Sequence, residues 1–250
     1  MFDGFLLRNN KNNYKTNTLF RINNLDKSYE KYEMQLEKGY FVEKLHFIDE
    51  KIFLVGAYDR VNDNDFIFET SIYEFDTNNS KRHVVHSSDT PLINSRNYYM
   101  FNNILVMSYR NEKNDEIMLF YDLIAKKIIN EINLENHLVS SNGLFSNNYI
   151  HKDEKLFIFR SAPNSVHTLV LDYKNNNFEV SKTMRFEAPE HIDIHEVFVH
   201  DNQWYILLKN NVRRTTLFKY EKSNASLELL LDFELKKCAK NLFFYDINLK

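Results

Sequence analysis

The chain has 250 residues, of which 43% are hydrophobic and 15% aromatic, and it carries a formal net charge of −3. These values exclude a globally disordered chain, and they argue against a nucleic-acid-binding protein, which usually concentrates positive charge. Only four Gly and three Pro are present, so the turns must be made from other residues. Asn and Asp are the evident substitutes, because both tolerate the left-handed backbone region.

The cysteine content and the lack of long apolar runs bear on the cellular environment. The single cysteine, Cys238, has no second cysteine with which to form an intramolecular disulfide, which favours a reducing compartment. The first ten residues lack the basic and apolar regions of a signal peptide. No apolar run approaches the ~18–20 residues of a membrane helix. We therefore expect a cytoplasmic protein that binds neither membranes nor nucleic acid.

Short runs of aliphatic and aromatic residues recur along the whole chain. They lie at 5–7, 52–55, 104–107, 156–159 and 204–207. A second run follows each of them and usually ends in an aromatic or aliphatic residue plus an acidic one, as in Phe75-Asp76 and Tyr121-Asp122. Both kinds of run recur with the same period of roughly 50 residues. This period predicts repeated four-stranded units of the kind that form propeller blades.

The repeat divides the chain into five predicted blades. In chain order they are approximately 1–36 plus 240–250, 42–87, 97–134, 145–186 and 194–234. The first blade begins with a strand at 2–8 and has no inner strand before it, whereas 241–245 near the C-terminus has the pattern of one. Adding this last strand to the first blade closes a ring and removes exposed sheet edges. We therefore predict an all-β, single-domain, five-bladed β-propeller; an open array of β-meanders and a larger propeller are the alternatives.

The second blade shows the strand pattern in full, and its strands are predicted at 42–48, 51–58, 66–75 and 81–86. Polar pairs separate the first two strands of the complete blades. These pairs are Asp49-Glu50, Asn102-Asn103, Asp153-Glu154 and Asp201-Asn202. Asn and Asp supply the positive φ values that tight hairpins demand, so we expect hairpins at these pairs. The segment 123–136 can be drawn as a helix, but its phase in the repeat fits an outer strand at 128–132.

The long connections between strands gather on one face of a propeller, and loops on a rigid scaffold commonly carry function. The predicted connections carry charges of both signs and no substrate signature. Arg is enriched in interface hot spots, so we predict that this face binds a protein or peptide partner and that the chain is a non-catalytic binding module, such as an inhibitor or immunity protein. The predicted partner-binding residues are Arg60, Asp63, Arg110, Arg213 and Arg214.

A carbohydrate-active hydrolase is the alternative function. Glycoside cleavage by the common mechanism needs two carboxylates that face each other across the bond, and the inner-strand positions offer Glu43 with Asp193 or Glu196. The sequence has no phosphate-binding loop, no dinucleotide fingerprint and no nucleophile elbow. No cofactor is therefore predicted.

A metal site is the third reading, and it rests on the segment 191–196. An extended backbone would place His191, Asp193 and His195 on one side, because side chains alternate along a strand. Two imidazoles and a carboxylate suit Zn²⁺ or another borderline divalent ion. The simpler interpretation is that the intervening isoleucines pack inward while the polar side chains face solvent. A calcium site at 59–65 is weaker still, because its spacing departs from the EF-hand pattern.

Overall fold

The computed structural model describes most of the chain. The described residues are 4–9, 16–23, 26–35, 40–48, 51–62, 65–78, 81–88, 98–113, 115–138, 148–162, 164–191, 193–210, 214–221 and 226–234. Apart from one short 3-10 helix, η1 (Leu134–Asn136), all regular structure in these ranges is antiparallel β-strand. Within the same ranges, no helix has the length and apolar character needed to cross a bilayer.

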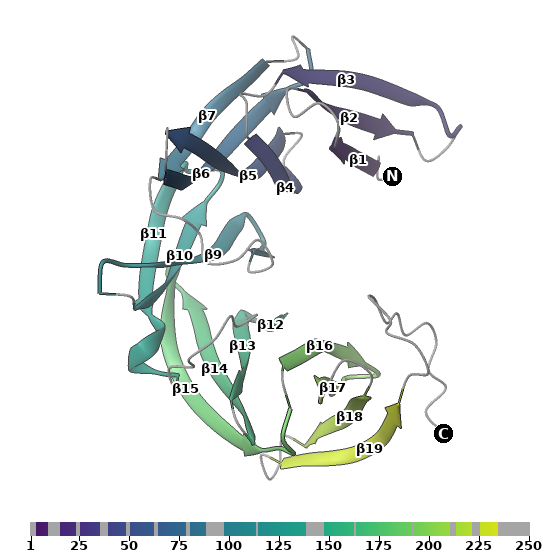
Figure 1. Cartoon of the computed structure of the whole chain (residues 1–250), viewed down its shortest axis with the longest axis vertical. Coiled ribbons are helices and arrows are strands. Elements are labelled where there is room, and N and C mark those ends of the chain that lie inside the picture. The colour runs from purple at the N-terminus through teal and green to yellow at the C-terminus, as the bar shows by residue number, and fades with distance from the viewer. Residues whose placement is uncertain are drawn as a thin grey trace. The chain divides into compact units, whose positions relative to one another are not determined.

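The chain divides into two compact units, Met1–Leu134 and Glu135–Lys250. The first unit holds three sheets, whose strands follow one another as simple meanders (Figure 1). The first sheet is β1 (Gly4–Asn9), β2 (Thr16–Ile22) and β3 (Tyr29–Gln35). The second is β4 (Tyr40–Ile48), β5 (Lys51–Asn62), β6 (Asp65–Asp76) and β7 (Lys81–Ser88). The third is β8 (Tyr99–Phe101), β9 (Ile104–Arg110), β10 (Glu116–Asp122) and β11 (Lys127–Asn133).

The second unit holds two further four-stranded meanders (Figure 1). One is β12 (Asn148–Lys152), β13 (Lys155–Ala162), β14 (Ser165–Lys174) and β15 (Asn177–Glu187). The other is β16 (Asp193–His200), β17 (Gln203–Lys209), β18 (Arg214–Glu221) and β19 (Ser226–Glu234). The described residues thus form one three-stranded and four four-stranded antiparallel sheets, as the repeat predicts.

The predicted strand positions agree closely with the structure, and the main difference is strand length. In the second sheet, β5 reaches Asn62 and β6 starts at Asp65, so the segment 59–65, considered above as a calcium site, is mostly strand. The β13–β14 connection is equally short, since β14 starts three residues after Ala162. The segment 123–136 forms strand β11 and η1, which confirms the predicted outer strand.

The predicted tight turns are confirmed where the structure describes them. Asp153 and Glu154 have φ values of 50° and 53°, and Asp201 and Asn202 have 47° and 59°. Two successive positive φ values define the type I′ turn, which matches the twist of the two strands that it joins. Asn102 adopts a φ of 55° at the corresponding position of the third sheet. Asn and Asp thus occupy backbone positions that many proteins give to glycine.

Glu154 is the least suitable of these turn residues, because glutamate lacks the short polar side chain with which Asn and Asp hydrogen-bond locally in the left-handed region. Replacing Glu154 with Gly is expected to raise the free energy of unfolding by about 1 kcal/mol, since glycine reaches positive φ without the Cβ clash. Urea unfolding followed by circular dichroism measures the change. Glu154→Ala is the matched control and should give no gain, so equal stabilisation by both variants would contradict the turn assignment.

The core of the first unit lies between its sheets. Residues 52–55 of strand β5 are buried on both faces, so the apolar residues of this run do not alternate with polar ones. Ile52 and Leu54 pack against the first sheet, in a cluster with Leu19. Phe53 and Val55 point to the opposite face and pack in a cluster with residues of the third sheet, which is why the run 52–55 is continuously hydrophobic.

The core of the second unit lies between its two sheets and centres on Trp204. Its side chain is 1% exposed. It contacts Phe157 and Phe159 of β13 edge to face, at ring-centroid distances of 4.4 and 6.0 Å. These contacts hold the two sheets together and give the loops at their ends a rigid support.

The predicted ring closure rests on residues that the structure does not describe. The segment 241–245 lies outside the described residues. In the first sheet β1 pairs with β2, and no described strand pairs with its other edge. The open edge of β1 agrees with the predicted lack of an inner strand, while the five-bladed closure and the single domain stay predictions.

Candidate functional site

Three connections meet at one end of the second unit. The backbone NH of Ala188, which follows β15, donates to the carbonyl oxygen of Asn164 in the β13–β14 turn at 3.0 Å. The Asn210 side-chain amide, which follows β17, donates to the carbonyl oxygen of Glu190 at 3.0 Å. Hydrogen bonds therefore tie the β13–β14, β15–β16 and β17–β18 connections together, and polar side chains gather on the strands that carry them.

Ser165 and His167 form the most chemically distinctive pair at this end. They are two residues apart on β14 and so lie on the same face of the sheet. The Ser165 Oγ lies 3.2 Å from the His167 Nε2, and the two residues are only 1% and 8% exposed. A hydroxyl in contact with a buried imidazole is the arrangement used for proton transfer in many hydrolases.

Two arginines flank His167 because of the strand register. His167 pairs with Arg160 on β13 and with Arg185 on β15, so all three side chains start from the same face. Arg160 is 1% exposed. The Arg185 Nε lies 3.6 Å from the Glu187 Oε1, and both of these side chains are exposed. The imidazole is therefore surrounded by two positive charges and one negative charge.

This environment keeps His167 neutral. Burial lowers the pKa of His167 below its ordinary value of 6.5, the positive charges of Arg185 and Arg160 lower it further, and Glu187 acts in the opposite direction. A neutral imidazole at pH 7 has a nitrogen lone pair available to accept a proton. His167 can therefore accept a proton at neutral pH.

The lowered pKa of His167 predicts a loss of stability in mild acid. As the pH falls, the unfolded chain protonates His167 near pH 6.5, whereas the folded chain protonates it only at a lower pH. The stability that comes from a neutral His167 is therefore fully present above pH 6.5 and is lost as the pH falls toward the pKa of the folded state. Urea unfolding at about pH 7.5 and about pH 5.5 measures this loss. His167→Gln should show a smaller loss than the wild type, and an equal loss in both proteins would contradict the assignment.

The predicted metal ligands do not come together. His191 is buried, and its Nδ1 lies 2.7 Å from the carbonyl oxygen of Pro189. A β-bulge at His195 interrupts the alternation, since Ile194 pairs with Leu208 and Glu196 with Leu207. Within the described parts of the chain, no three His, Cys, Asp or Glu side chains form a group that could hold a metal ion. The bulge therefore removes the alternation on which the predicted grouping of these three residues rested.

The predicted carboxylates are only partly described. Glu43 is the extra residue of a bulge in β4, between Val42 and Lys44, and its side chain lies outside the described part. Asp193 starts β16 and its Oδ1 accepts a hydrogen bond from the Ile194 NH at 2.8 Å. Glu196 is exposed on the same strand. A catalytic pairing of Glu43 with Asp193 or Glu196 stays a prediction.

Of the predicted partner-binding residues, only Arg214 has a described side chain. Its Nε donates to the Asp232 Oδ1 at 2.9 Å, across the β18–β19 pair. This contact holds the pKa of Asp232 below its ordinary value. The side chains of Arg60 and Arg110, and the whole of Asp63 and Arg213, lie outside the described residues. Arg214 thus has a structural partner within its own sheet.

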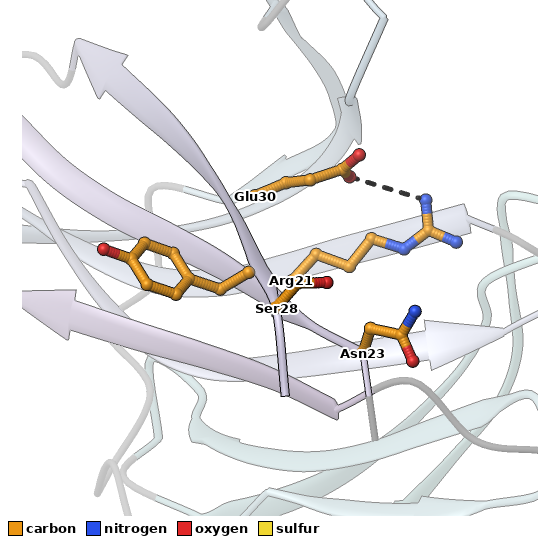
Figure 2. Close-up of a pocket in the computed structure, with 5 residues that line it drawn as sticks. Arg21, Asn23, Ser28 and Glu30 are labelled. Carbon is orange, nitrogen blue, oxygen red and sulfur yellow. Dashed lines mark ion pairs between the residues drawn. The ribbon is translucent and has the colours of Figure 1, made fainter. Parts of the chain in front are cut away.

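An open pocket of about 230 Å³ lies on the β2–β3 hairpin of the first unit. Figure 2 shows Arg21 and Glu30 pointing toward each other, with the Arg21 Nη1 3.7 Å from the Glu30 Oε2. The same Glu30 oxygen accepts a hydrogen bond from the Tyr32 hydroxyl at 2.6 Å. The Ser28 hydroxyl donates to the Asp26 carboxylate at 2.6 Å. The polar groups of this pocket form hydrogen bonds and an ion pair with one another within the hairpin. The pocket is therefore a weaker candidate for an active site than the Ser165–His167 pair.

Comparison with known proteins finds solved structures of similar fold. No protein-family model matches the sequence, and a search of the curated proteins finds no match. Among solved structures, the chain is similar to a putative 6-phosphogluconolactonase from Bacteroides fragilis, with a TM-score of 0.55 and 11% identity over 92% of this chain and 67% of that one. It is also similar to the periplasmic gluconolactonase PpgL of Pseudomonas aeruginosa, with a TM-score of 0.53 and 11% identity over 96% of this chain and 70% of that one.

A third similar structure is Sqt1 of Saccharomyces cerevisiae, with a TM-score of 0.53 and 9% identity over 87% of this chain. This chain spans 55% of the length of Sqt1. At such low identities the likeness concerns the fold. The chain is all-β, with antiparallel four-stranded sheets similar to those of lactonase-type propellers.

The predicted function as a non-catalytic binding module for a protein or peptide partner is wrong by this comparison. Two of the three structures named above are described as a putative 6-phosphogluconolactonase and a gluconolactonase, and they favour the carbohydrate-active hydrolase that the sequence offered as the alternative. The error has a physical reason. The absence of glycine-rich motifs excludes phosphate-binding loops, dinucleotide-binding loops and nucleophile elbows. A sheet can still form an active site from single side chains on several strands, and no local sequence motif reveals such a site.

Sequence reasoning also missed Ser165 and His167. The signal was present in the alternation of Ser165, Val166, His167 and Thr168, which places two polar side chains on one face of a strand. The arginines that make the pair distinctive come from β13 and β15, so the complete cluster is visible only once the strands are paired.

Proposed function

We propose that this chain is a hydrolase of sugar lactones and that His167 is its general base. The observation that carries the proposal is the buried contact between the Ser165 Oγ and the His167 Nε2, beside Arg160 and Arg185. The descriptions of two proteins of similar fold, one as a putative 6-phosphogluconolactonase and one as a gluconolactonase, support the choice of substrate class. Opening of a lactone requires activated water and stabilisation of negative charge on the carbonyl oxygen, which a neutral imidazole and a guanidinium supply.

The reaction begins with water at the Ser165 hydroxyl. This hydroxyl accepts a hydrogen bond from the water and donates one to the His167 Nε2, so the proton of the water passes through Ser165 to the imidazole. The water oxygen bonds to the lactone carbonyl carbon while positive charge from the arginines stabilises the oxyanion. The bond from that carbon to the ring oxygen then breaks, and His167 returns the proton to the ring oxygen, which leaves as a hydroxyl of the open-chain acid.

A direct assay tests this function. The purified chain is mixed with D-glucono-δ-lactone or with its 6-phosphate, and the acid released is followed with a pH indicator in weak buffer. We expect a rate proportional to protein concentration and well above spontaneous hydrolysis for at least one of the two lactones. Heat-denatured protein is the control. A rate equal to spontaneous hydrolysis with both lactones would refute the proposal.

We also propose that the sheets belong to a closed five-bladed propeller in which the segment 241–245 pairs with β1. The support is that no described strand pairs with the other edge of β1 and that the strand pattern recurs at 241–245, since an unpaired edge leaves backbone groups without partners. Deleting residues 241–250 should lower the midpoint of thermal unfolding and speed amide exchange in β1. Unchanged exchange in β1 would contradict closure by this segment.

A further inference from the structure

The last strands of the five described sheets, β3, β7, β11, β15 and β19, all lie at sheet edges, and β3 differs from the others (Figure 1). Each of the other four carries a β-bulge, where its register with the preceding strand shifts. The extra residues are Val85, Ile129, Ser181 and Leu230. Strand β3 pairs with β2 in one unbroken register over all of Tyr29–Gln35. Because bulges protect edge strands from pairing with another chain, β3 lacks a protection that the other four have.

The outer edge of β3 is available for pairing. No described strand pairs with it. Tyr29 is 67% exposed, and the side chains of Lys31 and Glu33 are 50% and 64% exposed. The adjoining stretches that lie outside the described residues are 24–25 and 36–39, and they are too short to form a strand along the whole of β3. The edge therefore presents a regular row of backbone donors and acceptors to a further strand.

The sequence of β3 is complementary to itself. When two copies of an edge strand pair antiparallel and continue one sheet, facing residues must lie on the same face, so the two-fold axis passes through a residue. An axis through Tyr32 pairs the whole strand from end to end and places Lys31 of each copy opposite Glu33 of the other. An axis through Lys31 would face lysine with lysine, and one through Glu30 or Glu33 would face glutamate with glutamate. Opposite charges across a strand pair stabilise it and like charges destabilise it.

We infer that β3 is a dimerisation edge, to which a second copy of this chain adds its own β3 about a two-fold axis at Tyr32. The two three-stranded sheets then form one continuous antiparallel sheet. Lys31 and Glu33 already form an ion pair of 2.6 Å within the chain, so the junction carries a group of alternating charges. A lysine on an edge strand discourages other chains, whereas a second copy supplies the matching glutamate. The inference is independent of the proposed lactonase function.

Sedimentation of the full chain tests this inference. One strand pair is a small interface, so we expect a weak dimer whose population rises with protein concentration over about 5–500 μM. Glu33→Lys places lysine opposite lysine on both sides of the axis and should weaken the dimer about tenfold or more. Glu179→Lys is the matched control, because it makes the same charge change at an exposed position of the bulged strand β15, and it should leave the dimer unchanged. Circular dichroism reports whether each variant is folded.

Exchanging the charges separates self-pairing from any other association. Lys31→Glu should weaken the dimer as Glu33→Lys does, whereas the double variant that carries both changes restores the complementarity and should dimerise like the wild type. A mixture of the two single variants should form a heterodimer, since each supplies the charges that the other lacks. A wild-type monomer at every concentration, as when residues 235–250 cover this edge, would overturn the inference. A dimer that Glu33→Lys leaves intact, or a mixture that fails to associate, would overturn it as well.

Discussion

Replacing His167 with Gln is expected to lower kcat for lactone hydrolysis by about 10²–10⁴-fold, the usual contribution of a general base. Glutamine approximates the size of the imidazole and keeps a polar group beside Ser165, but it cannot accept a proton at neutral pH. The acid-release assay gives the rate above the spontaneous background. The wild-type rate should rise through a pKa below 6.5, because burial and the two arginines lower the pKa of His167.

Two control variants sharpen this test. His151 is exposed on β12 of the same unit, so His151→Gln should retain full activity. Ser165→Ala should cost only about tenfold, the effect of one lost hydrogen bond, because a second water can replace the hydroxyl in the relay. A His167→Gln enzyme as active as His151→Gln would exclude His167 as the base. A Ser165→Ala loss as large as that of His167→Gln would instead indicate that Ser165 is the attacking nucleophile.

Replacing Trp204 with Ala is expected to lower the free energy of unfolding by about 3–5 kcal/mol, the range for large buried aromatic residues. The side chain is 1% exposed and fills the space between the two sheets of the second unit. Its ring lies 4.4 Å from that of Phe157 and 5.8 Å from that of Tyr220. Removing it leaves a cavity that the surrounding strands cannot fully close, and it breaks the aromatic contacts of the ring.

Urea unfolding followed by far-ultraviolet circular dichroism measures this loss, since Trp204 is the single tryptophan and its variants lack its fluorescence. Trp204→Phe is the matched control and should lose clearly less, because a phenyl ring fills much of the same space. Equal losses in the two variants, or a loss below about 1 kcal/mol in Trp204→Ala, would show that the two sheets are not held together at this residue.

The strands and turns of this protein could be predicted from sequence because their causes are local. Asp153-Glu154 and Asp201-Asn202 predict hairpins, since their side chains and neighbours set the backbone torsions. The continuous apolar run 52–55 predicts a strand buried on both faces, since alternate residues must point in opposite directions. The sequence also predicted function at the connections between strands, and Ser165 begins the strand that follows one of them.

Only the tertiary structure decided which side chains share a site. The bulge at His195 breaks the alternation that would have aligned His195 with Asp193, and a bulge depends on the pairing of β16 with β17. The cluster around His167 exists because β13 and β15 align Arg160 and Arg185 with it. Sequence by itself determined the strands and their turns, which depend on neighbouring residues. The structure determined the register between strands, which depends on residues far apart in the chain, and the register brings the chemical groups together.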